Sequence, residues 1–274
     1  MADAGLPPVV ARMWGRDTAA RYGPRPSQDV RAIVDAAIAI ADREGLDKVT
    51  MSSVAADVGV ATMSLYRYVG SKDELLLLMA DAAAPEPPAL EAQGWRAYLT
   101  AWTRANRDYL LGRPWQLTLG RTAPPAGPRT LRWLDRALAA LADTGLTHTE
   151  RINIATTLTG YASQQASVVV AMLGAAAAPP RPSATGTSGP GATAGPRGGP
   201  RGGSPALAEP IDGLVDYGRI LGELLEPEEY PALSAAVAEN AFGAAPDWID
   251  DADFQFGLDL LLDGIEALIA RRNK

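Results

Sequence analysis

The stretch that decides the fold is VTMSSVAADVGVATMSLYRYVGSKDELL, which runs from Val49 to Leu76. Its first part predicts a short helix that begins at Thr50, whose hydroxyl can cap the first free backbone N–H groups, and that ends at Gly59. After a turn, a second short helix is predicted over Thr62 to Tyr68, with Leu65 facing inward. Two short helices joined by a glycine-containing turn indicate a helix-turn-helix arrangement.

The segments on both sides of this stretch are also predicted to be helical. From Val30 to Ala41 the apolar residues recur at the spacing of one helix face, with Ser27 as the N-cap and Gly45 as the stop. The motif Ser71-Lys72-Asp73-Glu74 predicts a capping box that opens another helix, which runs to about Ala83. An earlier helix is therefore available to pack across the two short ones.

The composition and periodicity of the remaining chain predict a larger helical domain. Capping motifs and apolar spacing indicate helices near Trp95 to Gly112, Thr130 to Asp143, His148 to Leu173, Ile211 to Leu225, Pro231 to Phe242 and Asp251 to Arg271. In the helix near residues 130–143, the residues expected inside are Leu131, Leu134, Leu138 and Leu141. No strand pattern competes with these helices, so the predicted fold class is all-α.

Four parts of the chain follow from these patterns. Residues 174–206 contain 9 Gly and 7 Pro and no large apolar residue, so they are expected to form a disordered loop. The predicted parts are a flexible, irregular N-terminal arm over 1–28 that carries Arg12, Arg16, Arg21 and Arg25, a three-helix helix-turn-helix head over 29–84, and a larger helical domain over 90–274 that contains the loop.

The composition of the 274 residues excludes several kinds of chemistry. The chain has no Cys and one His, and its 25 Lys and Arg face 32 Asp and Glu, for a net charge of −7. Disulfides, thiol catalysis and thiolate zinc sites are excluded, and His148, inside a predicted capping box, is expected to be exposed. We therefore expect no metal, no cofactor and no enzyme activity. With no signal peptide and no long apolar run, a cytoplasmic protein without membrane contact is expected.

The stretch from Val49 to Leu76 resembles the DNA-binding head of the tetracycline-repressor (TetR/AcrR) family of bacterial transcription regulators. The resemblance covers about residues 29–83, and the pairs that carry it are Gly59-Val60, Leu65-Tyr66, Tyr68-Val69 and Ser71-Lys72. A weaker similarity, to the last helix of the family's regulatory domain, lies between Phe254 and Gly264. The family implies a helical homodimer in which a small ligand in the larger domain alters the spacing of two DNA-reading heads. The resemblance thus implies that the part over 90–274 is a regulatory ligand-binding and dimerisation domain.

The predicted DNA-binding residues lie on and around the second short helix. Thr62, Ser64 and Met63 offer hydrogen bonds and an apolar contact to base edges, and Arg67 offers a partner for guanine or phosphate. The resemblance implies phosphate contacts for Thr50, Tyr66, Tyr68 and Lys72. The full set is Thr50, Ser52, Thr62, Met63, Ser64, Tyr66, Arg67, Tyr68 and Lys72. Residues 1–80 hold 9 Lys and Arg against 10 Asp and Glu, so binding requires a concentrated face.

Polar and aromatic residues on otherwise apolar helices are the candidates for a ligand site. They are Trp102, Asn106, Tyr109, Trp133, Tyr161, Gln164 and Gln165, which together suggest a largely apolar cavity with a few hydrogen-bonding groups. Small residues mark a predicted dimer face, with packing inside one chain as the alternative. They are Gly160, Ser163, Gln164, Ser167 and Ala171 on one helix and Gly257, Leu261 and Gly264 on the last helix.

The function that these features favour is a ligand-responsive transcriptional regulator. It is expected to be a repressor that binds a pseudo-palindromic operator in double-stranded DNA as a homodimer and is released by a small, largely apolar effector. One alternative is a ligand-binding or scaffold protein whose head has lost DNA affinity. Another, a helical enzyme with a helix-turn-helix appendage, lacks a convergent set of catalytic residues.

Overall fold

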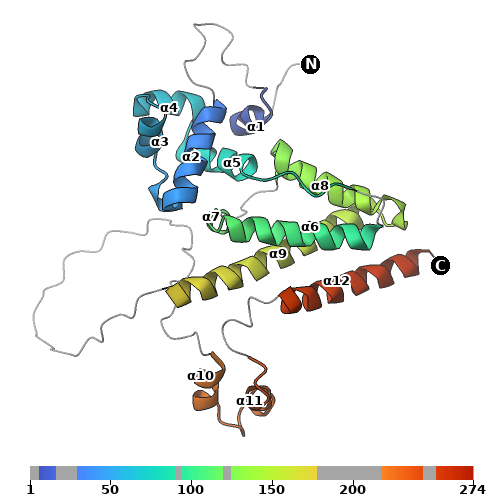
Figure 1. Ribbon diagram of the computed structural model, residues 1–274. Coiled ribbons are helices and arrows are strands. Elements are labelled where there is room, and N and C mark those ends of the chain that lie inside the picture. Colours follow the sequence, from blue (N-terminus) through green and yellow to red (C-terminus); the bar gives the residue numbers. More distant parts are fainter. Residues whose placement is uncertain are drawn as a thin grey trace, which may run out of the picture. The chain divides into compact units, whose positions relative to one another are not determined.

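The computed structural model describes residues 6–16, 30–90, 94–119, 125–177, 217–242 and 251–273, and all regular elements in these ranges are helices (Figure 1). This confirms the all-α fold class. The predicted N-cap Ser27, the arm residues 1–5 and 17–28, and the loop residues 178–206 lie outside the described ranges. The first four residues of the predicted loop, 174–177, instead continue a helix to Ala177. Within the described ranges, no helix is long and apolar enough to cross a membrane.

The chain divides into two compact units, one of residues 1–167 with 254–274 and one of residues 168–253. In the second unit, helices α10 (Tyr217–Leu224) and α11 (Pro231–Ala238) pack against each other as a hairpin. The Tyr217 and Phe242 rings meet edge to face with their centroids 5.6 Å apart. The first unit holds the predicted head and the greater part of the larger domain.

The head consists of α2 (Val30–Glu44), a single 3₁₀ turn (Leu46–Lys48), α3 (Met51–Asp57), α4 (Thr62–Val69) and α5 (Lys72–Ala82). Its core comes from the inward faces of all four α-helices and includes Ile33, Val34, Ala37, Val54, Leu65, Val69, Leu75 and Met79. Gly59 has a φ of +72°, which L-residues avoid, and this lets the chain reverse tightly between α3 and α4. The predicted helix-turn-helix is therefore confirmed.

The helix starts of the head follow the predicted caps with one difference. The Thr50 hydroxyl accepts a hydrogen bond from the Ser53 N–H at 3.0 Å, which begins α3. At α5, the Ser71 hydroxyl accepts from the Glu74 N–H at 3.1 Å. The Glu74 carboxylate, however, pairs with Arg12 and does not return to the backbone of Ser71. The capping box predicted at Ser71 is therefore half formed, because a distant arginine competes for its glutamate.

The expectation of an irregular arm is wrong for residues 8–13, which form helix α1 (Pro8–Met13). Pro8 presets the backbone angle of the first turn, and Val9 and Met13 pack against the head core. A six-residue helix is too short to show a periodic pattern or to be stable alone. Its contacts with α5 supply the stabilisation, and these are invisible in the local sequence.

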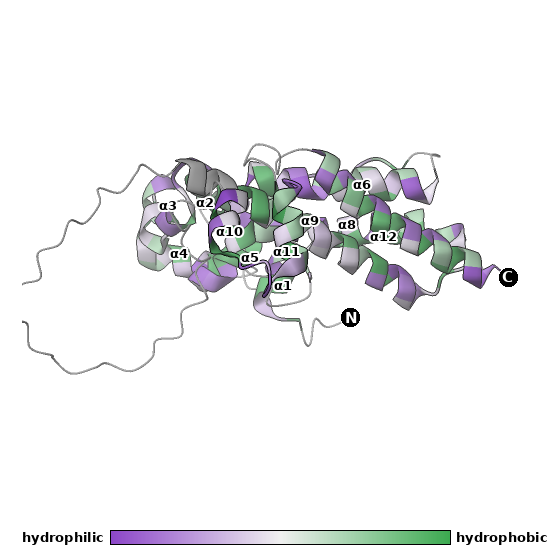
Figure 2. Ribbon diagram, turned by 90° about the horizontal axis from the view of Figure 1, so that it is seen from below, coloured by the Kyte–Doolittle hydropathy of each residue, from purple (hydrophilic) through white to green (hydrophobic). Residues whose placement is uncertain are grey.

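The rest of the first unit, here called the body, consists of α6 (Trp95–Gly112), α7 (Trp115–Thr118), α8 (Pro128–Ala140), a 3₁₀ turn (Ala142–Thr144), α9 (His148–Ala177) up to Ser167, and α12 (Asp251–Arg272) from Phe254. Figure 2 shows these helices with apolar and polar residues on different faces. The buried residues include Leu99, Trp102, Trp133, Ala137, Leu141, Leu158, Leu258 and Leu262.

The inward face of α8 differs from the prediction. In α8 and the following turn the buried residues are Trp133, Ala137, Leu141 and Thr144. Leu141 is thus inside as predicted, whereas Leu131, Leu134 and Leu138 are only half-buried. The four leucines suggested a face of their own. Burying the Trp133 side chain removes a larger apolar area from water than burying a leucine. The helix is therefore oriented with Trp133 toward the core.

The capping box predicted before α9 is complete, and it ties the helix to the end of α12. Glu150 accepts hydrogen bonds from the Thr147 N–H (2.8 Å) and from the Arg272 guanidinium, while His148 is exposed as expected. The arginine and the threonine lower the pKa of the Glu150 carboxyl from 4.5 to about 2.

This lowered pKa gives a pH-dependent prediction. The carboxyl binds its proton more weakly in the folded chain, so its contribution to stability is present above about pH 4.5 and is lost as the pH falls toward 2. An NMR titration of the Glu150 carboxyl should find its midpoint well below 4.5, and Arg272→Gln should move that midpoint upward. Equal midpoints in the two proteins would contradict the assigned cause.

Candidate functional site

Helix α4 has one face in the head core and the other in solvent. Leu65 and Val69 are completely buried, whereas the Met63 side chain is 77% exposed and Tyr66 is 41% exposed. Thr62, Ser64 and Tyr68 are half-buried at the border of the two faces, and the Tyr68 ring also packs against the core. The structure therefore places the predicted base-reading residues on one side of a helix that is anchored by its opposite side.

Two cations lie on or beside this face without a protein partner. Arg67 and Lys72 are exposed, and in the part of the chain that the structure describes neither forms an ion pair or a side-chain hydrogen bond. Most acidic residues of the head are engaged elsewhere. Glu44 pairs with Arg43, Glu74 with Arg12, Asp35 with Arg31 and Asp42 with Arg113. These four carboxylates are thus neutralised away from the α4 face, whereas Asp73, next to Lys72, is exposed.

The N-terminus of α3 presents two hydroxyls of unequal availability. The Thr50 Oγ1 atom already accepts from the Ser53 N–H and lies 3.0 Å from both the Ser52 and Ser53 hydroxyls. Ser52 is exposed. Because the Thr50 hydroxyl is occupied in the cap, Ser52 is the better placed of the two for a further hydrogen bond.

The C-terminus of α5 is joined to the body by hydrogen bonds that the sequence analysis missed. The backbone carbonyls of residues 83, 84 and 85 accept from Arg113 (2.9 Å), Arg129 (2.9 Å) and the Trp133 indole (2.7 Å), in that order. Asp42 on α2 also accepts from the Trp115 indole at 2.7 Å. Each of these donors is a side chain of the body. The acceptors are the backbone carbonyls that follow α5 and the Asp42 carboxylate of α2.

A buried carboxylate at the same junction caps a body helix. Asp81 of α5 is 7% exposed and accepts from the Thr130 N–H (2.9 Å) and the Thr130 hydroxyl (2.7 Å), at the first turn of α8. Gly127 lies so close that a β-carbon there would overlap the carboxylate. The one sequence signal for this contact is an aspartate near the end of the apolar run that forms α5.

Two candidate ligand residues meet in the body core. The Trp102 and Trp133 rings have centroids 5.7 Å apart, and the Trp102 indole N–H donates to the Trp133 carbonyl at 3.0 Å. Asn106, one turn along α6, is 7% exposed. Because the Trp133 indole reaches the carbonyl of residue 85, this pair connects the core of the body directly to the end of α5.

A second aromatic group belongs to the same core. The Tyr161 ring stacks on Phe254 at 5.3 Å, and its hydroxyl donates to the Phe254 carbonyl at 2.8 Å. The Arg107 guanidinium lies 4.1 Å from the Phe254 ring centroid. Phe254 and Arg107 were absent from the candidate set, although Phe254 lay in the stretch that resembles the family's last helix.

The remaining ligand candidates are more peripheral. Tyr109 and Gln165 are half-buried, and Gln164 is exposed on α9. The structure thus brings Trp102, Asn106 and Trp133 together inside the body, with Tyr161 in the adjoining aromatic group, but it does not bring Gln164 to them.

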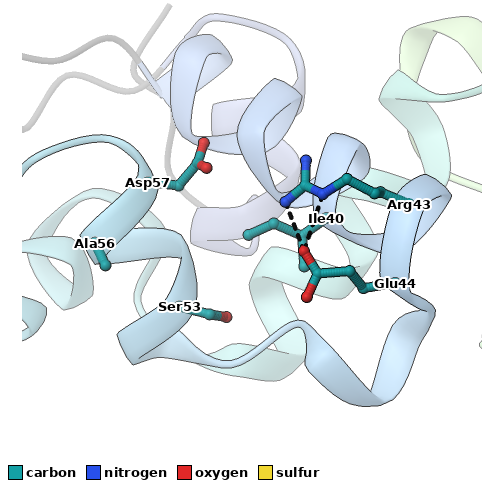
Figure 3. A pocket seen from close by; sticks show the side chains of 6 residues that line it. All are labelled: Ile40, Arg43, Glu44, Ser53, Ala56 and Asp57. Atoms are coloured by element: carbon teal, nitrogen blue, oxygen red, sulfur yellow. Dashed lines mark hydrogen bonds and ion pairs between the residues drawn. The ribbon is translucent and has the colours of Figure 1, made fainter.

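The hollows on the surface lie elsewhere. One, of about 400 Å³, lies between α2 and α3 and is lined by Arg43, Glu44, Ser53 and their neighbours (Figure 3). Three of its polar groups already have partners, since Arg43 pairs with Glu44 and the Ser53 hydroxyl donates to the Lys48 carbonyl at 2.7 Å. A second, of about 310 Å³, lies between α9 and α12. Among the described residues, no group of three or more His, Asp and Glu is placed to hold a metal.

The outer faces of α9 and α12 expose apolar and small residues. Ile152 is 43% exposed, Phe256 69% and Leu260 60%. Gly160 and Gly264 are exposed too, and a β-carbon at either would meet open space. Packing inside the described part of the chain therefore does not require glycine at these two positions.

A helix-turn-helix head with an exposed second helix, followed in the chain by a larger helical body, defines a helix-turn-helix transcription regulator. A sequence model described as "Bacterial regulatory proteins, tetR family" matches residues 33–79, and one described as "Tetracyclin repressor-like, C-terminal domain" matches residues 87–182 and 212–269. The chain belongs to the tetR family of bacterial transcription regulators, as the sequence resemblance indicated.

Curated relatives and solved structures agree with this assignment. The HTH-type transcriptional repressor DrrR1 of Streptomyces coeruleorubidus is 32% identical over 269 residues, which cover 95% of this chain and 85% of the relative. The repressor Rv1353c of Mycobacterium tuberculosis is 25% identical over 258 residues, 91% of this chain and 85% of the relative. Apo ActR of Streptomyces coelicolor has a TM-score of 0.64 at 21% identity, over 91% of this chain and 100% of ActR, and shares its fold.

Proposed function

We propose that the chain is a ligand-responsive repressor that acts in the cytoplasm, binds a pseudo-palindromic operator as a homodimer, and leaves it when a small, largely apolar effector binds the body. The observation that carries the proposal is the α4 face, where Arg67 and Lys72 are exposed beside Met63 and Tyr66 and form no ion pair with any described residue. Exposed cations beside an anchored helix suit binding to DNA, because the helix can lie in the major groove while the cations contact the phosphates. The curated relative DrrR1, itself named a repressor, supports the direction of control.

Within this proposal the residues of the head divide by task. Thr62, Met63 and Ser64, at the start of α4, face base edges, while Tyr66, Tyr68 and Lys72 contact phosphates. Helix N-termini in the major groove meet bases first, and hydroxyl and ammonium groups further along meet the backbone. Arg67 reaches either partner, and at the start of α3 Ser52 contributes a hydroxyl more readily than Thr50, whose oxygen is used in the cap.

The dimer is proposed to form through the outer faces of α9 and α12. These faces expose Phe256, Leu260 and Ile152 together with Gly160 and Gly264. Exposed apolar side chains favour burial, and glycines let two helices approach closely. Pairing two copies through these helices would bring two heads to one operator.

The effector is proposed to enter the aromatic core of the body. Trp102, Trp133 and Tyr161 offer apolar surface, and Asn106 offers a buried amide. Such a lining suits a flat, mainly apolar molecule with one or two polar groups. ActR, whose fold is similar, has been solved in complex with actinorhodin, and this supports a small-molecule effector for the present chain.

A direct test is an electrophoretic mobility shift on DNA from upstream of the chain's own gene. We assign two cations of each head, Arg67 and Lys72, to the DNA, which makes four per dimer, so we expect affinity to fall about a hundredfold between about 0.05 M and about 0.2 M salt. A complex of that salt dependence, with one dimer per palindrome, supports the proposal. A protein that binds no DNA but does bind aromatic ligands would favour the scaffold alternative.

A further inference from the structure

Helix α1 is attached to the head close to the turn that orients α4. Val9 and Met13 pack against the head core, and Arg12, whose side chain is 14% exposed, pairs with Glu74 in the first turn of α5. A β-carbon at Gly70, which joins α4 to α5, would lie 3.1 Å from the Arg12 guanidinium. The helix therefore abuts the connection between the DNA-reading helix and the rest of the head.

The residue that ends α1 reaches the body. The indole N–H of Trp14 donates a hydrogen bond to the carbonyl of Ala126 at 2.8 Å. Ala126 lies two residues before Pro128, where α8 begins, and the first turn of α8 is capped by Asp81 of the head. Helix α1 and its C-cap residue thus contact the head through Arg12 and the body through Trp14.

Helix α1 also lies outside the residues that the family's head model matches, which begin at residue 33. Its two polar contacts join positions 62 and 112 residues away in sequence. Contacts across such separations order a short terminal segment that would not be helical alone. The contacts, and not a local sequence signal, therefore indicate what this segment does.

We propose that α1 is a strap that holds the head on the body and positions α4 for an operator with two half-sites. Arg12 and Trp14 are its positioning residues, and neither needs to touch DNA. The effect on operator affinity that this inference predicts rests on the proposed function, whereas the effect on the exchange of backbone amides does not. A head held in one orientation meets two half-sites at less entropic cost than a head that moves on a flexible joint.

The test uses the full chain with Trp14→Phe, which keeps an aromatic ring and removes the N–H donor. We expect the backbone amides of residues 129–131 to exchange with deuterium about fivefold faster, the effect of one lost hydrogen bond on a local opening equilibrium. Affinity for a two-half-site operator should fall about fivefold, while affinity for an isolated half-site stays within twofold. Trp95→Phe, a half-buried tryptophan at the start of α6, is the matched control and should change none of these quantities.

A second variant, Arg12→Gln, releases the other end of the strap and should give the same pattern. Unchanged amide exchange in both variants would overturn the strap. An equal loss on the half-site and on the full operator would also overturn it, because α1 would then act on α4 or on DNA directly. If the parent protein binds no operator, the proposed function fails, and the exchange measurement still decides whether α1 joins the head to the body.

Discussion

Replacing Tyr66 and Lys72 together with Ala should weaken operator binding about a hundredfold, with little change between operator sequences. Each dimer would lose two hydroxyls and two ammonium groups that we assign to phosphates, and phosphate contacts position a protein without reading bases. Loss of two cations should also reduce the slope of log affinity against log salt by about 2. Fluorescence anisotropy at several salt concentrations measures both quantities.

The control for this variant removes a tyrosine hydroxyl and a positive charge outside the head. Tyr230 and Arg271 are exposed, on the segment before α11 and at the end of α12, and their joint replacement with Ala should leave operator affinity unchanged. By contrast, changes at Thr62 or Ser64 should alter which base pairs are preferred. An intact affinity in the Tyr66 and Lys72 variant would remove the assignment of these residues to phosphate.

Asp81→Ala and Gly127→Ala should each destabilise the chain by about 2–3 kcal/mol, and for related reasons. The first removes a buried carboxylate that accepts two hydrogen bonds from Thr130 and caps α8, and loss of a cap together with charge-assisted hydrogen bonds has this magnitude. The second adds a β-carbon in the space of the same carboxylate. Urea unfolding followed by circular dichroism measures each loss.

The double variant distinguishes this explanation from general damage. Once Asp81 is Ala, the β-carbon at residue 127 has room, so the double variant should be about as stable as Asp81→Ala alone. Simple addition of the two losses would show that Gly127 matters for another reason. Asp143→Ala, at an exposed aspartate in the turn after α8, is a matched control and should change stability by less than about 0.5 kcal/mol.

The sequence was sufficient to predict the parts of the fold that rest on local signals. The Thr50 cap, the turn at Gly59 and the apolar faces of α2 and α4 depend on residues within a few positions of one another, and the structure confirms them. The all-α class and the family also follow from such signals. The roles assigned to individual DNA and ligand residues remain predictions, because they concern molecules that the sequence does not contain.

The parts that the sequence did not reveal depend on distant partners. Glu74 lies at the right spacing for a capping box, but it pairs with an arginine 62 residues earlier. The inward face of α8 includes Trp133, which packs on Trp102 of α6, whereas the leucine spacing also predicted Leu131, Leu134 and Leu138 inside. In each case two local arrangements were acceptable, and a tertiary contact selected one of them.

One feature of the head core limits how this protein can be recombined with its relatives. Trp115 of α7 is 7% exposed and belongs to the same buried cluster as the helices of the head, although it follows them by more than thirty residues. A chimaera joined in the segment between α5 and α6 would separate the DNA-reading part from a tryptophan that completes its interior. A functional exchange of specificity would therefore have to transfer Trp115 together with the head, which already carries its hydrogen-bond partner Asp42.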